Sequence, residues 1–119
     1  MSESKLRSLS VDFSVQIINL VKLLKEQREL IMSNQIGRSG TSIGANIHEA
    51  QYAHGKADFI AKLQIALKEA SETGYWLELL LRTDYINETQ FKQLDDNCTR
   101  LRVILISSIN TAKGKHAKN

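Results

Sequence analysis

The chain has 119 residues, with 16 lysines and arginines against 13 aspartates and glutamates, three histidines, no proline and one cysteine. The lone Cys98 excludes an intramolecular disulfide and suits a reducing cytoplasm. No signal-like apolar run opens the chain, and no segment approaches the roughly 18 apolar residues of a membrane span. We therefore expect one cytoplasmic domain without a membrane partner. Its formal charge of +3 permits contact with nucleic acid without requiring it.

Apolar residues three or four positions apart predict a first helix that ends near residue 24. They are Leu6, Leu9, Phe13, Ile17, Leu20 and Leu24, with Val11, Val15, Ile18 and Val21 widening the stripe. An apolar face this broad should contact two or more neighbours. The polar run Lys25–Arg28 indicates a break within residues 25–33, although neither glycine nor proline marks it.

A second helix is predicted over about residues 30–53, although its three glycines lower its intrinsic propensity. Its apolar face carries Ile36, Gly40, Ile43, Ile47 and Ala50 at helical spacing. A helix that tolerates this much glycine must gain close backbone contact with a neighbouring helix. Gly55 reads as the residue that ends the helix in a left-handed conformation.

Two more helices complete the pattern. The third runs from about Lys56 to Arg82, with an apolar face of Phe59, Leu63, Ala66, Ala70, Leu77 and Leu81. Asn87 and Gln90 form a capping box that opens the fourth helix, whose inward positions are Leu94, Cys98, Leu101, Ile104, Leu105 and Ile109. Short connections between four amphipathic helices favour an all-α, up-down-up-down four-helix bundle over residues 1–112. A disordered basic tail is expected over 113–119.

A polar stripe runs beside the apolar face of the second helix. It consists of Arg38, Ser39, Ser42, Asn46 and Glu49, with Glu69 and Glu72 as candidate partners on the third helix. The stripe could be a groove that receives a ligand, or a network that joins the two helices. A half-buried charge needs a partner, so the network is favoured. Asn46 and Glu49 are then expected to be shielded and hydrogen-bonded to the third helix.

The runs Gln35–Ala50 and Ile65–Leu77 together resemble the bacterial four-helix bundle family, also called the large-subunit ribosomal RNA intervening-sequence protein family. The first run carries Arg-Ser-x-x-Ser-Ile-x-x-Asn-Ile-x-Glu, and the second contains Trp76. The family is similar in fold to the accessory protein of diversity-generating retroelements, a pentameric barrel that binds a reverse transcriptase and nucleic acid. The resemblance therefore implies a homopentamer and brings no catalytic residues.

The sequence offers no catalytic, cofactor or metal site. His48 and Glu49 begin like a zincin motif, but Tyr52 stands where the second histidine is required. The GxxxxGK phosphate loop is absent, and Cys98 lies on the apolar face of its helix. We expect a protein that is not an enzyme and binds no cofactor.

Two functions remain. The first is a homo-oligomeric scaffold or interaction protein, whose interface uses Tyr75, Trp76 and Leu79 beside the core positions of the third helix. The second is a nucleic-acid binding accessory protein that uses a basic surface. Its candidate contacts are Lys22, Lys25 and Arg28 at the end of the first helix, Arg100 and Arg102 on the fourth helix, and Lys113, Lys115 and Lys118 in the tail.

Overall fold

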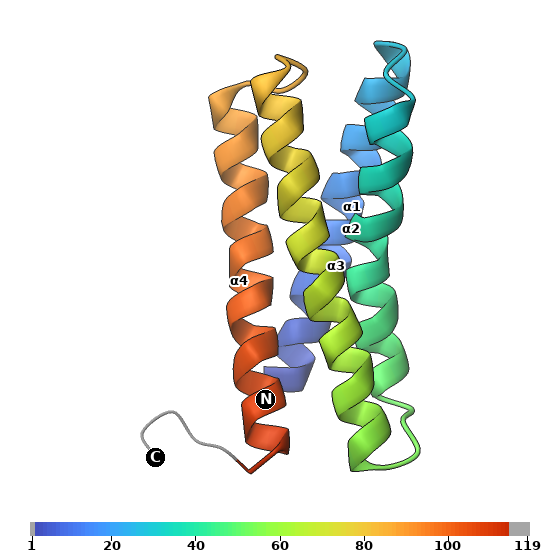
Figure 1. Cartoon of the computed structure of the whole chain (residues 1–119), viewed down its shortest axis with the longest axis vertical. Helices are drawn as coiled ribbons and strands as arrows, with labels where there is room; N and C mark the ends of the chain where they lie inside the picture. Colours follow the sequence, from blue (N-terminus) through green and yellow to red (C-terminus); the bar gives the residue numbers. More distant parts are fainter. Residues whose placement is uncertain (1, 115–119) are drawn as a thin grey trace.

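The computed structural model describes residues 2–114, which fold into four helices without a strand. The helices are α1 (Ser2–Glu26), α2 (Ile31–Ala50), α3 (Lys56–Arg82) and α4 (Glu88–Ala112). They run up, down, up and down side by side, as Figure 1 shows. Each helix packs on the next one in the chain, and α4 returns to α1. The all-α four-helix prediction is confirmed.

The α1–α2 break falls within the predicted window and uses no glycine. Arg28 takes a left-handed conformation with φ of 62°, and the neighbouring Glu29 N–H donates to the Leu24 carbonyl at 2.9 Å. Asp84 (φ 66°) ends α3 in the same way, since the Tyr85 N–H donates to the Leu80 carbonyl at 3.0 Å. Both turns are Schellman-type ends in which a polar residue replaces the usual glycine.

The prediction for Gly55 is wrong. The second helix ends at Ala50 rather than near residue 53, and Gly55 is the residue that opens α3, with φ of 123°. The backbone N–H groups of Gln51, Tyr52 and Ala53 each donate to the carbonyl three residues earlier, which forms tight turns after the last residue of α2. The positive φ is therefore needed at the start of α3.

The ends of α4 agree with the sequence pattern. The Gln90 N–H donates to Asn87 Oδ1 at 2.8 Å and the Asn87 N–H donates to Gln90 Oε1 at 2.9 Å, so the predicted capping box is confirmed. The helix ends at Ala112. Residues 115–119, most of the predicted tail, lie outside the described residues.

The glycines of α2 let α1 approach closely. A Cβ atom on Gly40 would lie 2.8 Å from Ile17 Cγ1, and one on Gly44 would lie 3.2 Å from Ser14 Oγ. Residues on the predicted apolar face of α2 are all buried. These glycines are therefore packing residues, as the sequence indicated.

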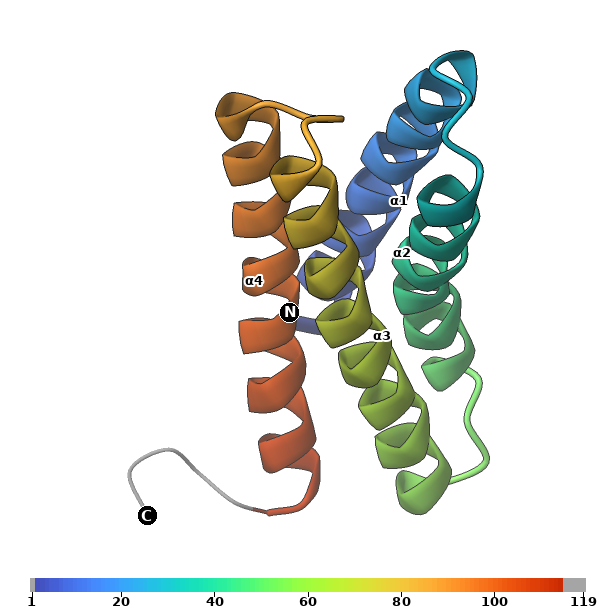
Figure 2. The same ribbon diagram turned by 45° about the horizontal axis from the view of Figure 1, so that its top comes forward.

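The contact between α1 and α4 is the least extensive in the bundle. Toward the end that holds the α1–α2 connection, α1 and α2 diverge from α3 and α4 in both ribbon views (Figures 1 and 2). A pocket of about 210 Å³ opens there, lined by Leu20 and Leu23 of α1 and by Gln90 and Leu94 of α4, among others. Within residues 2–114, no helix is long and apolar enough to cross a membrane.

Only part of the broad apolar face of α1 is used within the chain. Val21 packs against the core beside Gly37, as expected for a second contact. Val11, Val15 and Ile18 remain 46%, 53% and 46% exposed. The described residues thus leave an exposed apolar stripe on α1.

Candidate functional site

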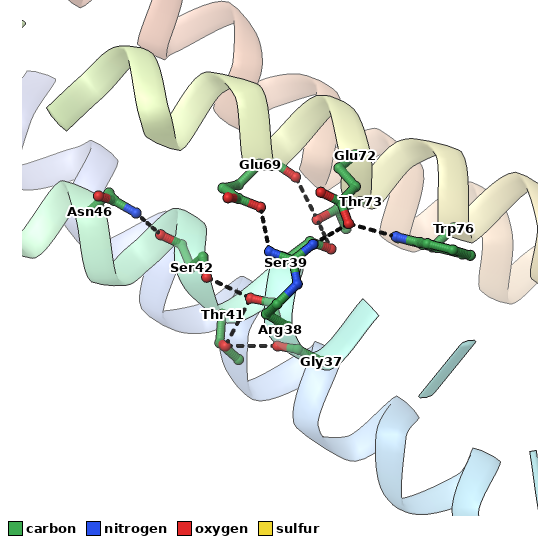
Figure 3. Close-up of polar contacts among 10 residues, drawn as sticks. All are labelled: Gly37, Arg38, Ser39, Thr41, Ser42, Asn46, Glu69, Glu72, Thr73 and Trp76. Carbon is green, nitrogen blue, oxygen red and sulfur yellow. Dashed lines mark hydrogen bonds and ion pairs between the residues drawn. The ribbon is translucent and has the colours of Figure 1, made fainter. Parts of the chain in front are cut away.

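The polar stripe of α2 meets α3 at Arg38. This side chain is 50% exposed and spans both predicted carboxylates (Figure 3): its Nη1 donates to Glu69 Oε1 at 3.2 Å and its Nη2 to Glu72 Oε2. Glu69 and Glu72 stand three residues apart, on one face of α3. The guanidinium therefore clamps two successive turns of α3 onto α2.

Glu72 has a second partner. Trp76, one turn further along α3, donates its indole Nε1–H to Glu72 Oε2 at 3.0 Å. Hydrogen bonding from Trp76, followed by that from Arg38, lowers the pKa of Glu72 below its ordinary value. The same hydrogen bond from Arg38 to Glu72 raises the pKa of Arg38. Glu72 is therefore held in its ionised form by groups of both helices.

A buried hydroxyl pair lies beneath the clamp. Ser39 of α2 and Thr73 of α3 are both fully buried, and their side-chain oxygens are 2.9 Å apart. Thr73 Oγ1 also lies 2.8 Å from the Glu69 carbonyl oxygen. One hydroxyl has one proton, so donation by Thr73 to that carbonyl leaves Ser39 as the donor between the two side chains. Sequence reasoning missed Thr73, whose only signal is its place between Ala70 and Leu77 on the core face.

The rest of the stripe does not reach α3 in the predicted way. Ser42 Oγ donates to the Arg38 carbonyl at 2.7 Å, and Asn46 Nδ2 donates to the Ser42 carbonyl at 2.9 Å. Short polar side chains in a helix reach the carbonyl one turn back, and these two do so. The expectation that Asn46 hydrogen-bonds to the third helix is therefore wrong.

Glu49 reaches α3 but is not shielded. Its carboxylate accepts an ion pair from Lys62 Nζ at 3.0 Å, and its side chain is exposed. This contact raises the pKa of Lys62. The expected burial of Glu49 is wrong, because its position on the outer edge of α2 leaves the pair in water.

The predicted interface residues of α3 differ in exposure. Tyr75 is exposed, whereas Trp76 and Leu79 are half-buried. The Tyr75 and Trp76 rings meet edge to face, with centroids 5.1 Å apart. Trp76 is thus engaged in a hydrogen bond to Glu72. Tyr75 is the most exposed of the three residues.

The structure does not gather the predicted basic residues on one surface. Lys22, Lys25 and Arg28 lie at the α1–α2 end of the bundle, and Lys113 follows α4 at the opposite end. Arg100 and Arg102 line different pockets, the first between α1 and α4 and the second between α3 and α4. Lys115 and Lys118 lie outside the described residues.

Residues 2–114 contain no group of three histidine, cysteine or acidic side chains that could hold a metal ion. The ring of His48 packs against Tyr52 with centroids 5.4 Å apart. Cys98 is buried, its Sγ donates to the Ala70 carbonyl at 3.3 Å, and burial raises its pKa to about 12. The thiol is therefore a protonated core group rather than a nucleophile.

Comparison with known proteins agrees with this arrangement. The family model described as 23S rRNA-intervening sequence protein matches residues 2–107. A crystal structure described as a protein with unknown function from the S23 ribosomal protein family of Bacteroides thetaiotaomicron is 53% identical, with a TM-score of 0.90, over 92% of this chain and 99% of that one. No curated protein matches. The chain belongs to the 23S rRNA-intervening sequence protein family.

Proposed function

We propose that this protein is a non-enzymatic, homo-oligomeric scaffold that acts in the cytoplasm by binding other proteins. One observation carries the proposal: Arg38, Ser39 and Glu49 of the polar motif join α2 to α3, while large apolar side chains stay exposed elsewhere. Among the residues that the structure describes, eleven such side chains are exposed, on all four helices and at their ends. Three of them, Val11, Val15 and Ile18, are neighbours on one face of α1, and a contiguous exposed apolar patch is typical of an interaction surface.

The number of chains rests on the family resemblance, which points to a pentamer. A cyclic assembly lets identical chains cover apolar surface without open-ended growth. The α3 residues Tyr75, Trp76 and Leu79 are one candidate seam, in which Tyr75 offers the most exposed ring.

Light scattering coupled to gel filtration, at micromolar chain concentration, tests the assembly. The expected mass is that of five chains of 13.4 kDa. The mass of a single chain would refute the scaffold as an oligomer, whereas two or four chains would refute only the pentamer.

A second candidate function is nucleic-acid binding as an accessory protein, with a reverse transcriptase as an expected partner. Its support is the exposed basic residues at both ends of the bundle: Lys22, Lys25 and Arg28 at one, Lys5, Arg7, Lys56 and Lys113 at the other. Five copies of the +3 chain carry a charge of about +15, which attracts phosphate backbones. In a gel-shift titration, affinity should fall steeply as salt rises. Affinity that does not change with salt would argue against a phosphate-binding surface.

A further inference from the structure

The exposed stripe on α1 points directly away from the core. Val15 stands two residues from both Phe13 and Ile17, which are buried, and this places it roughly opposite them around the helix. The sides of α1 are already occupied: Ile17 meets Gly40 of α2, and Gln16 Oε1 accepts a hydrogen bond from Asn97 of α4 at 3.0 Å. Within the described residues, the stripe therefore stays about half exposed, between the two helices that flank α1.

A matching stripe lies on the outer face of α4. Val103 is 60% exposed and Ile106 46%, although Leu101 and Leu105 beside them are buried. Val103 stands two residues from each of these leucines, again roughly opposite the core. This second stripe is likewise left exposed by the described part of the chain.

Both stripes have the spacing of a helix–helix seam. On α1, the positions Ser8, Val11, Val15, Ile18 and Lys22 alternate steps of three and four residues; on α4, Asp96, Thr99, Val103, Ile106 and Asn110 do the same. This 3-4 pattern is the one by which two helices pack side by side. Because α1 and α4 lie at different corners of the bundle and each stripe faces outward, the two cannot meet within one chain.

We propose that the α1 stripe of one chain packs on the α4 stripe of a second copy, as the repeating contact of the ring. This inference rests on the proposed oligomeric function and identifies its two faces. A cyclic assembly of more than two chains needs two different faces that fit each other, because a self-complementary face closes at a dimer. One α1–α4 contact covers both stripes, whereas pairing α1 with α1 would leave α4 bare.

Charge supports this pairing and sets its register. The two helices run in opposite directions within a chain, so in a ring about the bundle direction they meet antiparallel. The register that places Val11 against Ile106 and Val15 against Val103 also brings the exposed Lys22 beside the exposed Asp96, whose carboxylate also pairs with Lys92 of α4 at 3.1 Å. Opposite charges at the edge of an apolar seam favour this register over its neighbours.

The two helices offer seams of equal length. α1 and α4 each have 25 residues, and a helix of that length spans roughly 38 Å at about 1.5 Å per residue. The two stripes would form the apolar centre of the contact, and polar residues its rim.

Two single variants and their mixture test the inference. Val15→Glu blocks the α1 face and Val103→Glu the α4 face, so each variant alone should elute as a monomer. Mixed in equal amounts, they should form a one-to-one dimer and nothing larger, because each retains the face that the other lacks. Ile65→Glu, at an exposed α3 position outside both stripes, is the control and should assemble like the parent. Circular dichroism checks that all three are folded.

A parent protein that is itself monomeric would refute the proposed oligomer. An oligomeric parent whose Val15→Glu and Val103→Glu variants assemble normally would leave that function standing and overturn only this inference. A mixture that stays monomeric would also overturn it.

Cross-linking provides a readout that does not depend on disrupting the fold. A chain with both Val15→Cys and Val103→Cys should oxidise to a ladder of covalent multimers. Chains with one of the two changes should give no ladder, because Cys98 is buried. Absence of a ladder from the double variant of an oligomeric protein would refute the contact.

Discussion

The close approach of α1 and α2 at Gly40 leads to a prediction of opposite effects at two glycines. Gly40→Ala adds a methyl group whose carbon would lie 2.8 Å from Ile17 Cγ1 and 2.9 Å from Ile17 Cγ2. Both atoms sit next to the Ile17 Cβ and cannot swing away as a flexible chain end would. Gly74→Ala is the matched control, because a Cβ there would meet nothing within 4 Å.

The magnitudes follow from two competing terms. Alanine favours a helix interior over glycine by about 1 kcal/mol, and overpacking a filled core costs about 1–3 kcal/mol. Only the first term acts at Gly74, so Gly74→Ala should raise the free energy of unfolding by about 1 kcal/mol. At Gly40 the added carbon would lie under 3.0 Å from two Ile17 carbons, so the clash should reach the upper part of that range, about 2–3 kcal/mol. Less the gain of about 1 kcal/mol, it should lower the free energy of unfolding by about 1–2 kcal/mol.

Urea unfolding followed by circular dichroism measures both effects, at one chain concentration because assembly couples to stability. A Gly40→Ala variant as stable as the parent would show that α1 and α2 are not as close as the structure has them. Gly40→Ser should be at least as unstable as Gly40→Ala, because its side chain is larger.

Three further predictions concern the α2–α3 contact and the core. Thr73→Val leaves the buried Ser39 hydroxyl without its partner and should lower the free energy of unfolding by about 1–3 kcal/mol. In urea unfolding, the double variant Thr73→Val, Ser39→Ala should lose less free energy of unfolding than the two single variants lose together. Hydrogen bonds from Trp76 and Arg38 lower the pKa of Glu72 below its ordinary value of 4.5. The stabilisation that ionised Glu72 provides is therefore complete above pH 4.5 and is lost as the pH falls through the lower pKa of the folded state. Glu72→Gln should make the free energy of unfolding depend less on pH in this acidic range. In folded protein at pH 8, Cys98 should react with iodoacetamide far more slowly than in urea, because burial raises its pKa to about 12. Equal rates would show that the thiol is not buried.

Features that depend on nearby residues were predictable from the sequence. The bounds of α3, the Asn87–Gln90 capping box and the buried face of α2 follow from spacing and local hydrogen bonding. Arg38 could also be matched to Glu69 and Glu72, because three carbon–carbon bonds carry a guanidinium far enough to meet either carboxylate. Long charged side chains tolerate small errors in register.

Short side chains do not tolerate such errors, and the sequence prediction failed there. Ser42 and Asn46 point along the same face as Arg38, but each is satisfied by a carbonyl one turn back. Thr73 was missed because a threonine within an apolar face gives no sign of the serine opposite it. The breaks at Arg28 and Asp84 were likewise unmarked, since polar residues there adopt the backbone that glycine usually provides.

The family motif and the outer stripes divide the helices between two tasks. The motif fastens α2 to α3 through Arg38 and Ser39, so changes there should alter the free energy of unfolding. The stripes on α1 and α4 remain about half exposed in the described part of the chain, so changes at Val15 or Val103 should alter the mass of the proposed assembly while each folded chain keeps its helices. A variant of Val15 that unfolds the chain, or a variant of Ser39 that changes only the mass, would contradict this division. Measuring stability and mass on the same set of variants therefore separates the residues that fold the chain from those that we propose for its assembly.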